Sequence, residues 1–305
     1  MNFLRLLGRP RPGIALPTEC GFDQQLKALT PFLCDETIEE IWFGHADRAH
    51  ARSRERTIIP MELAWTPIET LDFIADLSVV CGVRLDPMRP FGGGVLPGLP
   101  WRWHASIPPF SPDGPRVSFR RQRFGALGQD DFNCENFDFA ELARQVKAGV
   151  SLLFFGATGS GKTSLMVSVM KDFFYNYRVG IAETVLEMPL VSPYWFRLTE
   201  VSQDTGHRGG VDFQRVVSEL MRATPDLIVL GEIRGAEAGY LGELARSGHG
   251  GVCSTIHAGS YQEAMSRIVS LSGHQVQSLP RIAGVHVWRA QSGGFNARFE
   301  GFRSS

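Results

Sequence analysis

The segment Gly156-Ala-Thr-Gly-Ser-Gly161-Lys162-Thr163 decides the fold of this 305-residue chain. It satisfies the pattern G-x-x-x-x-G-K-[ST], in which glycines let the backbone curl so that several N–H groups point at phosphate oxygens. A short apolar run, residues 152–155, precedes it, and residues 164–177 place apolar side chains on one broad helical face. A strand, a glycine loop and a helix in this order predict a phosphate-binding loop, and they disfavour a glycine-rich turn with an accidental lysine.

The side chains of this loop have separate expected roles. The ammonium of Lys162 can reach the β- and γ-phosphates of a nucleotide, and the hydroxyl of Thr163 can bind Mg²⁺. ATP and Mg²⁺ are therefore the expected ligands. The loop residues that we predict to bind the nucleotide are Gly156, Thr158, Gly159, Ser160, Gly161, Lys162, Thr163 and Ser164.

Outward from the loop, strands and helices alternate. Residues 227–230 and 252–256 are apolar runs typical of buried strands, whereas residues 139–148 and 211–224 have helical periodicity. Such alternation predicts an α/β domain, residues 139–305, with a parallel sheet covered by helices on both faces.

The first third of the chain has a different organisation. A helical segment and a short strand at residues 37–43 are followed by helical spacing over residues 68–80 and by two paired strands, residues 101–108 and 116–123. These elements predict a small α+β domain, residues 1–123. Residues 124–138 are rich in Gly, Asn, Asp and Gln, and we interpret them as a linker.

The composition limits the class of protein. Hydrophobic residues make up 43% of the chain, and the net charge is −1. No global basic field exists, so sequence-specific nucleic acid is not an expected partner. The five cysteines are far apart and contain no Cys-x-x-Cys pair, which excludes a zinc ribbon and favours reduced thiols. Without an apolar run long enough for a signal peptide or a membrane span, we expect a cytoplasmic protein, at most peripheral to a membrane.

Three acidic residues downstream of the loop are candidates for chemistry. Glu232 comes just after the strand at residues 227–230, and ligands of α/β sheets bind beyond the carboxyl ends of the strands. A carboxylate there can orient or deprotonate water, although a solvated loop glutamate is the alternative. Glu183 and Glu187 follow another apolar stretch, and we predict that Glu183 binds Mg²⁺ through water or activates water. Either could instead be a surface charge.

Two histidines flank the strand at residues 252–256. His249 and His257 would share one face of a regular strand, but no cysteine or carboxylate stands at ligand spacing, so a metal site is disfavoured. A polar sensor of the γ-phosphate and a satisfied core histidine remain open for each. His257 is the catalytic candidate.

Four ordered segments together resemble a known family: GATGSGKTS, IAETVLE, PDLIVLGEIRGAEA and SGHGGVCSTIHAGS. They are similar to the Walker A motif, Asp box, atypical Walker B motif and His box of the traffic ATPases of bacterial type II and type IV secretion and of type IV pili. The resemblance implies a RecA-like C-terminal domain after a small PAS-like one.

The resemblance also assigns roles. Glu232 matches the residue that polarises the attacking water, Glu183 and Glu187 match the first and last acids of the Asp box, and His257 matches the His-box residue near the γ-phosphate, with His249 next to it. Arg222 and Arg234 match the arginine-bearing Walker B segment. Thr184 departs from the family, which has a second acid there, and this predicts plausible but slow hydrolysis.

Arginines of the first domain form a further resemblance. Ile107-Pro-Pro and Arg116-Val-Ser-Phe-Arg120-Arg121 are similar to segments in which the family's N-terminal arginines reach nucleotide at a subunit border. The planar guanidinium suits phosphate. Arg102, Arg120 and Arg121 are the candidates, and a solvated basic strand face is the alternative.

The family implies a homohexameric ATPase that powers a secretion, conjugation or pilus machine with inner-membrane components, on the cytoplasmic face of that membrane. Arg-Gly-x-Glu-Ala, from Arg234 to Ala238, is closer to the type IV secretion and conjugation branch than to the general secretion branch, whose four-cysteine zinc insert this chain lacks. The alternatives are a type IV pilus or type II secretion motor, and a regulatory or structural subunit that binds nucleotide but hydrolyses little. Small-molecule phosphotransfer is a third class, and nothing in the chain resembles an acceptor lid.

Overall fold

The computed structural model describes residues 22–44, 47–62, 65–122, 127–135, 138–184, 186–200, 210–235, 237–246, 251–273, 281–291 and 293–302. The chain divides into two compact units, Met1–Arg123 with Gln203–Arg208, and Phe124–Ser202 with Gly209–Ser305. Within the ranges given, the helices are too short or too polar to cross a membrane.

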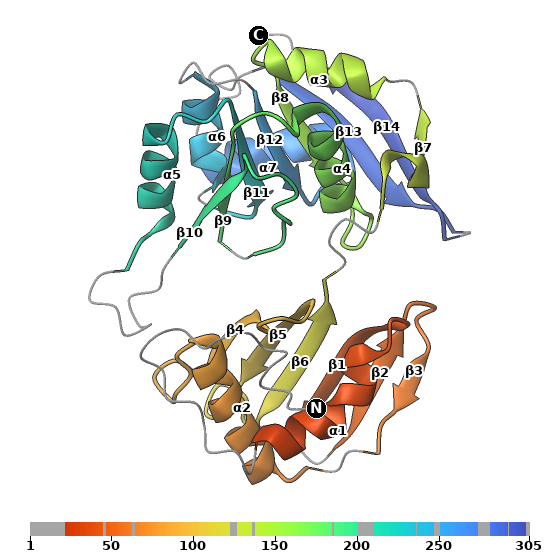
Figure 1. Ribbon diagram of the computed structural model, residues 1–305, viewed down its shortest axis with the longest axis vertical. Coiled ribbons are helices and arrows are strands. Elements are labelled where there is room, and N and C mark those ends of the chain that lie inside the picture. The colour runs from red at the N-terminus through yellow and green to blue at the C-terminus, as the bar shows by residue number, and fades with distance from the viewer. Residues whose placement is uncertain are drawn as a thin grey trace. The chain divides into compact units, whose positions relative to one another are not determined.

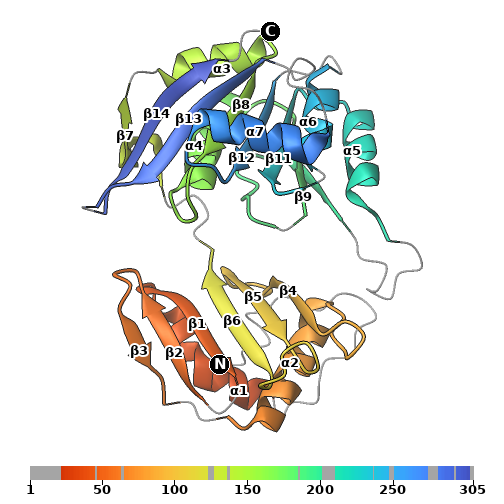
Figure 2. The same cartoon turned by 180° about the vertical axis from the view of Figure 1, so that it is seen from behind.

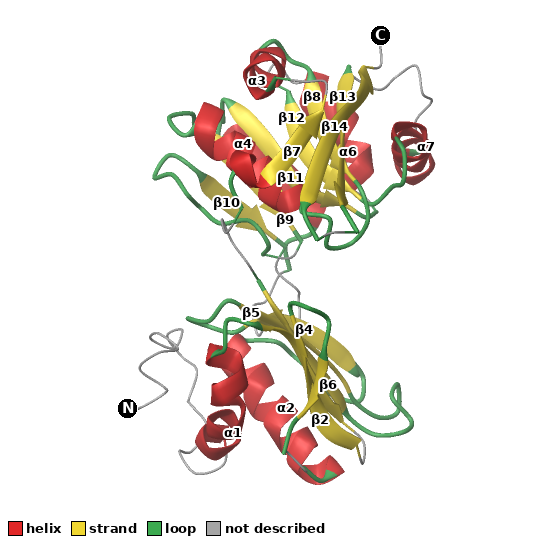
Figure 3. Ribbon diagram, turned by 90° about the vertical axis from the view of Figure 1, so that its right-hand side faces the viewer, coloured by secondary structure: helices red, strands yellow, loops and turns green. Residues whose placement is uncertain are grey.

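The first unit is an antiparallel sheet with two helices on one face (Figure 3). Six strands in the described part of the chain have the order β3-β2-β1-β6-β5-β4. The elements are α1 Phe22–Cys34, β1 Ile38–Gly44, β2 Asp47–Ser53, β3 Ile58–Pro60, α2 Pro67–Cys81, β4 Phe91–Val95, β5 Trp101–Ser106 and β6 Arg116–Arg121. The predicted α+β domain is confirmed, whereas its likeness to a PAS domain stays a prediction.

Alternation along β5 and β6 separates the core of this unit from its outer face. Trp101, Trp103 and Phe119 are buried under α1 and α2. Their neighbours in sequence point the other way, so Arg102 and Arg120, which are partners in the β5–β6 register, share the opposite face of the sheet. The two strands predicted from the sequence thus present the two arginines side by side.

The second unit contains the glycine loop and is built on a mostly parallel sheet. In the described residues eight strands have the order β10-β9-β11-β12-β8-β13-β14-β7. Its elements are β7 Phe132–Glu135, α3 Phe139–Lys147, β8 Ser151–Phe155, α4 Lys162–Phe174, β9 Val179–Glu183, β10 Phe196–Thr199, α5 Phe213–Arg222, β11 Leu227–Ile233, α6 Glu237–Arg246, β12 Val252–Ile256, α7 Tyr261–Ser272, β13 Ile282–Arg289 and β14 Phe295–Phe302.

Two layers of helices enclose this sheet, as Figures 1 and 2 show. The helices α3 and α4 pack on one face, against Leu152 and Phe154 of β8 among others, and α5, α6 and α7 pack on the other, against Leu153 and Phe155. Strands buried on both faces must be apolar throughout, which explains the runs seen in the sequence. The predicted parallel sheet with helices on both faces is confirmed.

The strand order decides which residues meet. The strand β12 lies between β8, which leads into the glycine loop, and β11, which carries Glu232 near its end. All three strands are parallel, so the ends of β8, β11 and β12 lie at one edge of the sheet.

The expected linker is wrong for part of its length. Phe132–Glu135 form β7, which pairs in parallel with β14. Phe132 is buried, and its ring centroid lies 5.4 Å from that of Phe295. The packing of Phe132 on Phe295 thus attaches this otherwise polar segment to the sheet. The C-terminal part of the chain, which had no assigned role, supplies the β13–β14 hairpin beside β8.

Candidate nucleotide-binding site

The glycine loop leaves β8 in a conformation that requires glycine. Gly156 has φ +154°, and a Cβ there would lie 2.0 Å from the carbonyl oxygen of Val287. Gly159 and Gly161 have φ of +74° and +93°, in the left-handed region that other residues rarely adopt. The loop therefore runs close to β13 and curls back into α4.

The start of α4 fits an anion. The helices α2, α3, α5 and α7 have side-chain caps from Thr66, Asp138, Asp212 and Ser260. The N-cap residue of α4 is Gly161, which has no side chain to cap the N–H groups of that helix. The hydroxyl oxygen of Ser160 is buried and has no hydrogen-bond partner among the described residues. Uncapped N–H groups and an orphaned hydroxyl beside a buried lysine are suited to phosphate oxygens.

Lys162 occupies the centre of this loop. It is 6% exposed, and its ammonium donates to the carbonyl oxygen of Ala157 at 2.8 Å. Its Nζ also lies 3.2 Å from Nδ1 of His257. A buried ammonium is costly unless it is compensated, so an anion at the loop would stabilise it. Thr163 and Ser164 follow in the first turn of α4, partly exposed, and Thr158 is exposed in the loop.

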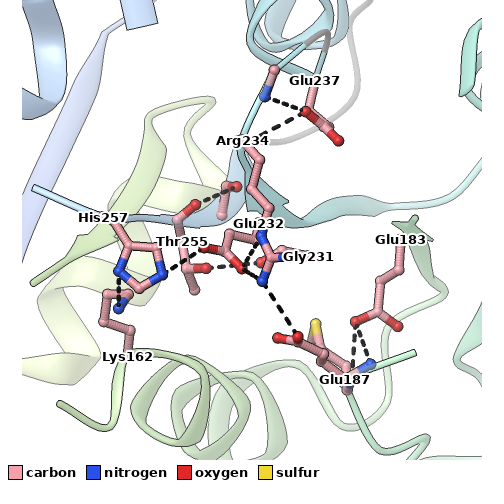
Figure 4. A network of polar contacts seen from close by, with 12 residues as sticks. Lys162, Glu183, Glu187, Gly231, Glu232, Arg234, Glu237, Thr255 and His257 are labelled. Carbon is pink, nitrogen blue, oxygen red and sulfur yellow. Dashed lines mark hydrogen bonds and ion pairs between the residues drawn. The ribbon is translucent and has the colours of Figure 1, made fainter. Parts of the chain in front are cut away.

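A chain of polar contacts extends from Lys162 across the edge of the sheet (Figure 4). His257 Nε2 lies 2.9 Å from Oε1 of Glu232. The other oxygen of Glu232 accepts the Nε–H of Arg234 at 2.7 Å, and Arg234 NH2 lies 3.5 Å from Oε1 of Glu187. Residues from β11 and the turn after it, from the segments after β9 and β12, and from the start of α4 thus meet at one place.

The partners of His257 decide its tautomer. A lysine ammonium can only donate, so Nδ1 is an acceptor and Nε2 carries the proton that faces Glu232. Burial lowers the pKa of His257, and the Lys162 ammonium lowers it further, whereas Glu232 opposes both. His257 is therefore neutral at pH 7, and it links the loop lysine to Glu232.

Glu183 joins this chain of contacts at its far end, where it accepts the backbone N–H of Glu187 (Figure 4). It ends β9, is 3% exposed, and directs its carboxylate toward the loop that follows it (Figure 4). Burial raises the pKa of its carboxyl to about 7, whereas Arg197 and two backbone donors lower it. The expected contact of Glu183 with Mg²⁺ stays a prediction; in the structure Glu187 is linked to Glu232 through Arg234.

The remaining candidates have other places. Arg222 lies at the end of α5, where it pairs with Glu219 at 2.9 Å, outside the network. His249 falls outside the described residues. In the first unit, Arg121 donates to the carbonyl oxygens of Ile38, Leu33 and Asp35, and its guanidinium lies 4.4 Å from the Trp101 ring centroid.

Three residues at this edge were not predicted from the sequence to have a role in the site. Thr255 donates to the carbonyl oxygen of Gly231 at 3.0 Å, and Glu237 accepts the N–H of Gly235 at 2.7 Å, so both shape the backbone around Glu232. Arg197 pairs with Glu183. A charged residue within the strand-like run Phe196–Thr199 was the signal for Arg197, because such a side chain needs a partner.

Relatives match both units. A putative conjugal transfer protein of Mycobacterium tuberculosis is 30% identical over 208 residues, which are 64% of this chain and 58% of that protein. This chain thus spans about three fifths of the length of that relative. The conjugal transfer protein TrbB of Rhizobium radiobacter is 26% identical over 81% of this chain and 76% of its own length.

Solved structures share the fold. The pilus retraction motor PilT with bound ADP superposes with a TM-score of 0.63 at 16% identity, over 91% of this chain and 82% of that one. The family model described as type II/IV secretion system protein matches residues 104–289, which include the loop, Glu232 and His257. This chain therefore belongs to the type II/IV secretion system protein family.

Proposed function

We propose that this chain is an ATPase that powers a type IV secretion or conjugation machine. The observation that carries the proposal is the meeting of Lys162, His257 and Glu232 at the edge of the sheet, beside an uncapped helix start and a Ser160 hydroxyl whose N–H and O–H groups can donate to phosphate oxygens. The names of its relatives, conjugal transfer proteins, support the choice of machine.

The residues act in a simple order. Loop N–H groups and Lys162 would hold the phosphates, and Thr163 would hold Mg²⁺. Bound Mg²⁺ supplies charge stabilisation at the phosphate oxygens. Glu232 orients a water and takes its proton while the water oxygen bonds to the γ-phosphorus and the bond from that phosphorus to the bridging oxygen breaks, so that ADP and phosphate leave. His257 holds one oxygen of Glu232 in place. Arg234 holds the other oxygen.

The oligomer and the location are part of the same proposal. We expect a homohexameric ring at the cytoplasmic face of the inner membrane, bound to membrane components of the machine. Arg102 and Arg120 stay candidates for binding phosphate, because they are register partners on one face of the sheet and their guanidinium groups suit that anion. Sedimentation with an ATP analogue and Mg²⁺ checks the ring, and a monomer under saturation contradicts it.

The test of the reaction is phosphate release. The chain should release phosphate from ATP only when Mg²⁺ is present, and Lys162→Ala should lower both nucleotide affinity and turnover. A chain that binds ATP with Mg²⁺ but releases no phosphate would instead be the nucleotide-binding subunit that Thr184 brings into consideration. Phosphate passed to an added acceptor rather than to water would indicate phosphotransfer.

A further inference from the structure

The loop after β9 is wound around the carboxylate of Glu183. Oε1 of Glu183 accepts the backbone N–H of Glu187 at 3.1 Å and that of Met188 at 2.9 Å. Two N–H donors on one buried carboxylate oxygen fix the backbone of the loop, because their loss would leave buried polar groups unsatisfied. Glu183 thus fixes the backbone of Glu187.

Arg197 holds the same loop from the neighbouring strand. The strand β10 pairs in parallel with β9, and Nε of Arg197 lies 3.0 Å from Oε2 of Glu183. The NH2 group of Arg197 also donates to the carbonyl oxygen of Met188. Both side chains of the pair are largely buried, with 19% of Arg197 and 2% of Glu183 exposed. The guanidinium therefore joins the carboxylate and the loop into one unit.

The backbone of β11 provides the space for this carboxylate. A Cβ on Gly231 would lie 2.7 Å from Cγ and 3.0 Å from Oε1 of Glu183. Gly231 directly precedes Glu232, so the Glu183 side chain rests against the strand that carries the proposed catalytic carboxylate. Oε1 of Glu183 accepts two backbone N–H groups of the loop after β9 (Figure 4), and Oε2 lies in an ion pair with Arg197 but makes no hydrogen bond among the described residues.

The held loop delivers a second carboxylate to the site. Glu187 Oε1 lies 3.5 Å from NH2 of Arg234, and the same NH2 lies 2.5 Å from Oε2 of Glu232. We propose that Glu183 and Arg197 are positioning residues: they fix the loop at Glu187 and Met188, and neither contacts nucleotide or Mg²⁺. The kinetic part of this inference rests on the proposed ATPase function.

The experiment compares Glu183→Ala, Glu183→Gln and Arg197→Met by hydrogen exchange of single amides and by ATPase kinetics. Glu183→Ala removes the acceptor, so the amides of Glu187 and Met188 should exchange at least about tenfold faster. The same variant should lower kcat by about 10- to 100-fold through misplacement of Glu187, with KM for ATP unchanged. Arg197→Met should change both readouts in the same direction, although this residue was never a candidate ligand.

Glu183→Gln separates position from charge. The amide oxygen of Gln can still accept both N–H groups. If the amides of Glu187 and Met188 stay protected from hydrogen exchange in this variant, its kcat should be at least about a tenth of the wild-type value. A variant with protected amides and a kcat as low as that of Glu232→Gln would overturn the proposal, because the charge of Glu183 would then act directly. Protection that survives in Glu183→Ala, or activity that survives without protection, would also overturn it.

Failure of the proposed function is distinguishable from failure of this inference. Amide exchange needs no turnover, so a wild-type chain that hydrolyses no ATP would refute the ATPase while the exchange rates still decide what holds the loop. Glu187→Gln serves as the matched control: it should lower kcat and leave both backbone amides protected, because its side chain does not accept them.

Discussion

His257 Nε2 lies 2.9 Å from Oε1 of Glu232, and the two residues reach this distance from neighbouring parallel strands. On its other side, His257 accepts from Lys162 of the glycine loop. A neutral imidazole is the only form that can serve both partners, because the protonated ring has no acceptor for the lysine. The pair therefore depends on the protonation state of His257.

Acid should weaken the contact between His257 and Lys162. The pKa of His257 is lowered by burial and by Lys162, so we expect an NMR titration midpoint below about 6.5 in the nucleotide-free chain. Because the folded state disfavours the charged form, stability should fall as the pH drops through this range. Lys162→Met removes the neighbouring charge and should raise the midpoint. A wild-type midpoint above 6.5 would contradict the arrangement.

Gly156 should not tolerate a side chain. Gly156→Ala places a Cβ 2.0 Å from the carbonyl oxygen of Val287 at a positive φ, so we expect a loss of about 2–4 kcal/mol in the free energy of unfolding. Gly149→Ala is the control, since Gly149 also has positive φ but has no atom within 4 Å of the added Cβ, and it should cost about 1 kcal/mol. Equal losses in urea unfolding would rule out the close approach to β13.

Arg121 should matter for stability rather than for nucleotide. Its guanidinium donates to three backbone carbonyls and lies over Trp101, so Arg121→Ala should cost about 2 kcal/mol of stability. Arg116→Ala on the same strand, where the side chain is 60% exposed, should change it by less than about 0.5 kcal/mol. Thermal unfolding measures both, and a silent Arg121→Ala would show that these contacts are dispensable.

The cysteines should differ in reactivity. Burial raises the pKa of Cys253 to about 12 and that of Cys81 to about 11, where Trp103 donates to its sulfur. Cys34 is exposed at the end of α1. In the native chain, iodoacetamide should modify Cys34 and leave Cys253 intact until the chain unfolds. Mass spectrometry of the peptides reads this out, and early labelling of Cys253 would mean that β12 opens.

Much of the site could be predicted from local sequence. Lys162 and Glu232 each follow an apolar run that can only be a buried strand, and parallel strands end at one edge of a sheet. The central position of His257 follows from the same rule once β12 lies between β8 and β11. Short apolar runs indicate buried strands and closely spaced glycines indicate a tight loop, and both patterns can be recognised from neighbouring residues alone.

Contacts between distant segments could not be predicted. The burial of Glu183 depends on the β9–β10 pairing that brings Arg197 to it, and on the space left by Gly231 on β11. Likewise, β7 falls within the segment expected to be a linker, because its partner β14 lies near the other end of the chain. The residues next to Glu183 in the sequence give no sign of Arg197, and those next to Phe132 give no sign of β14.

The measurement that tests the central claim most directly is the fate of ATP on Glu232→Gln. This substitution keeps the size of the side chain, but the amide that replaces the carboxylate cannot take a proton from water. With Mg²⁺, wild-type chain should release phosphate continuously, and the variant should bind ATP with similar affinity but release phosphate at least about 100-fold more slowly. Phosphate release at the wild-type rate by Glu232→Gln would contradict the account.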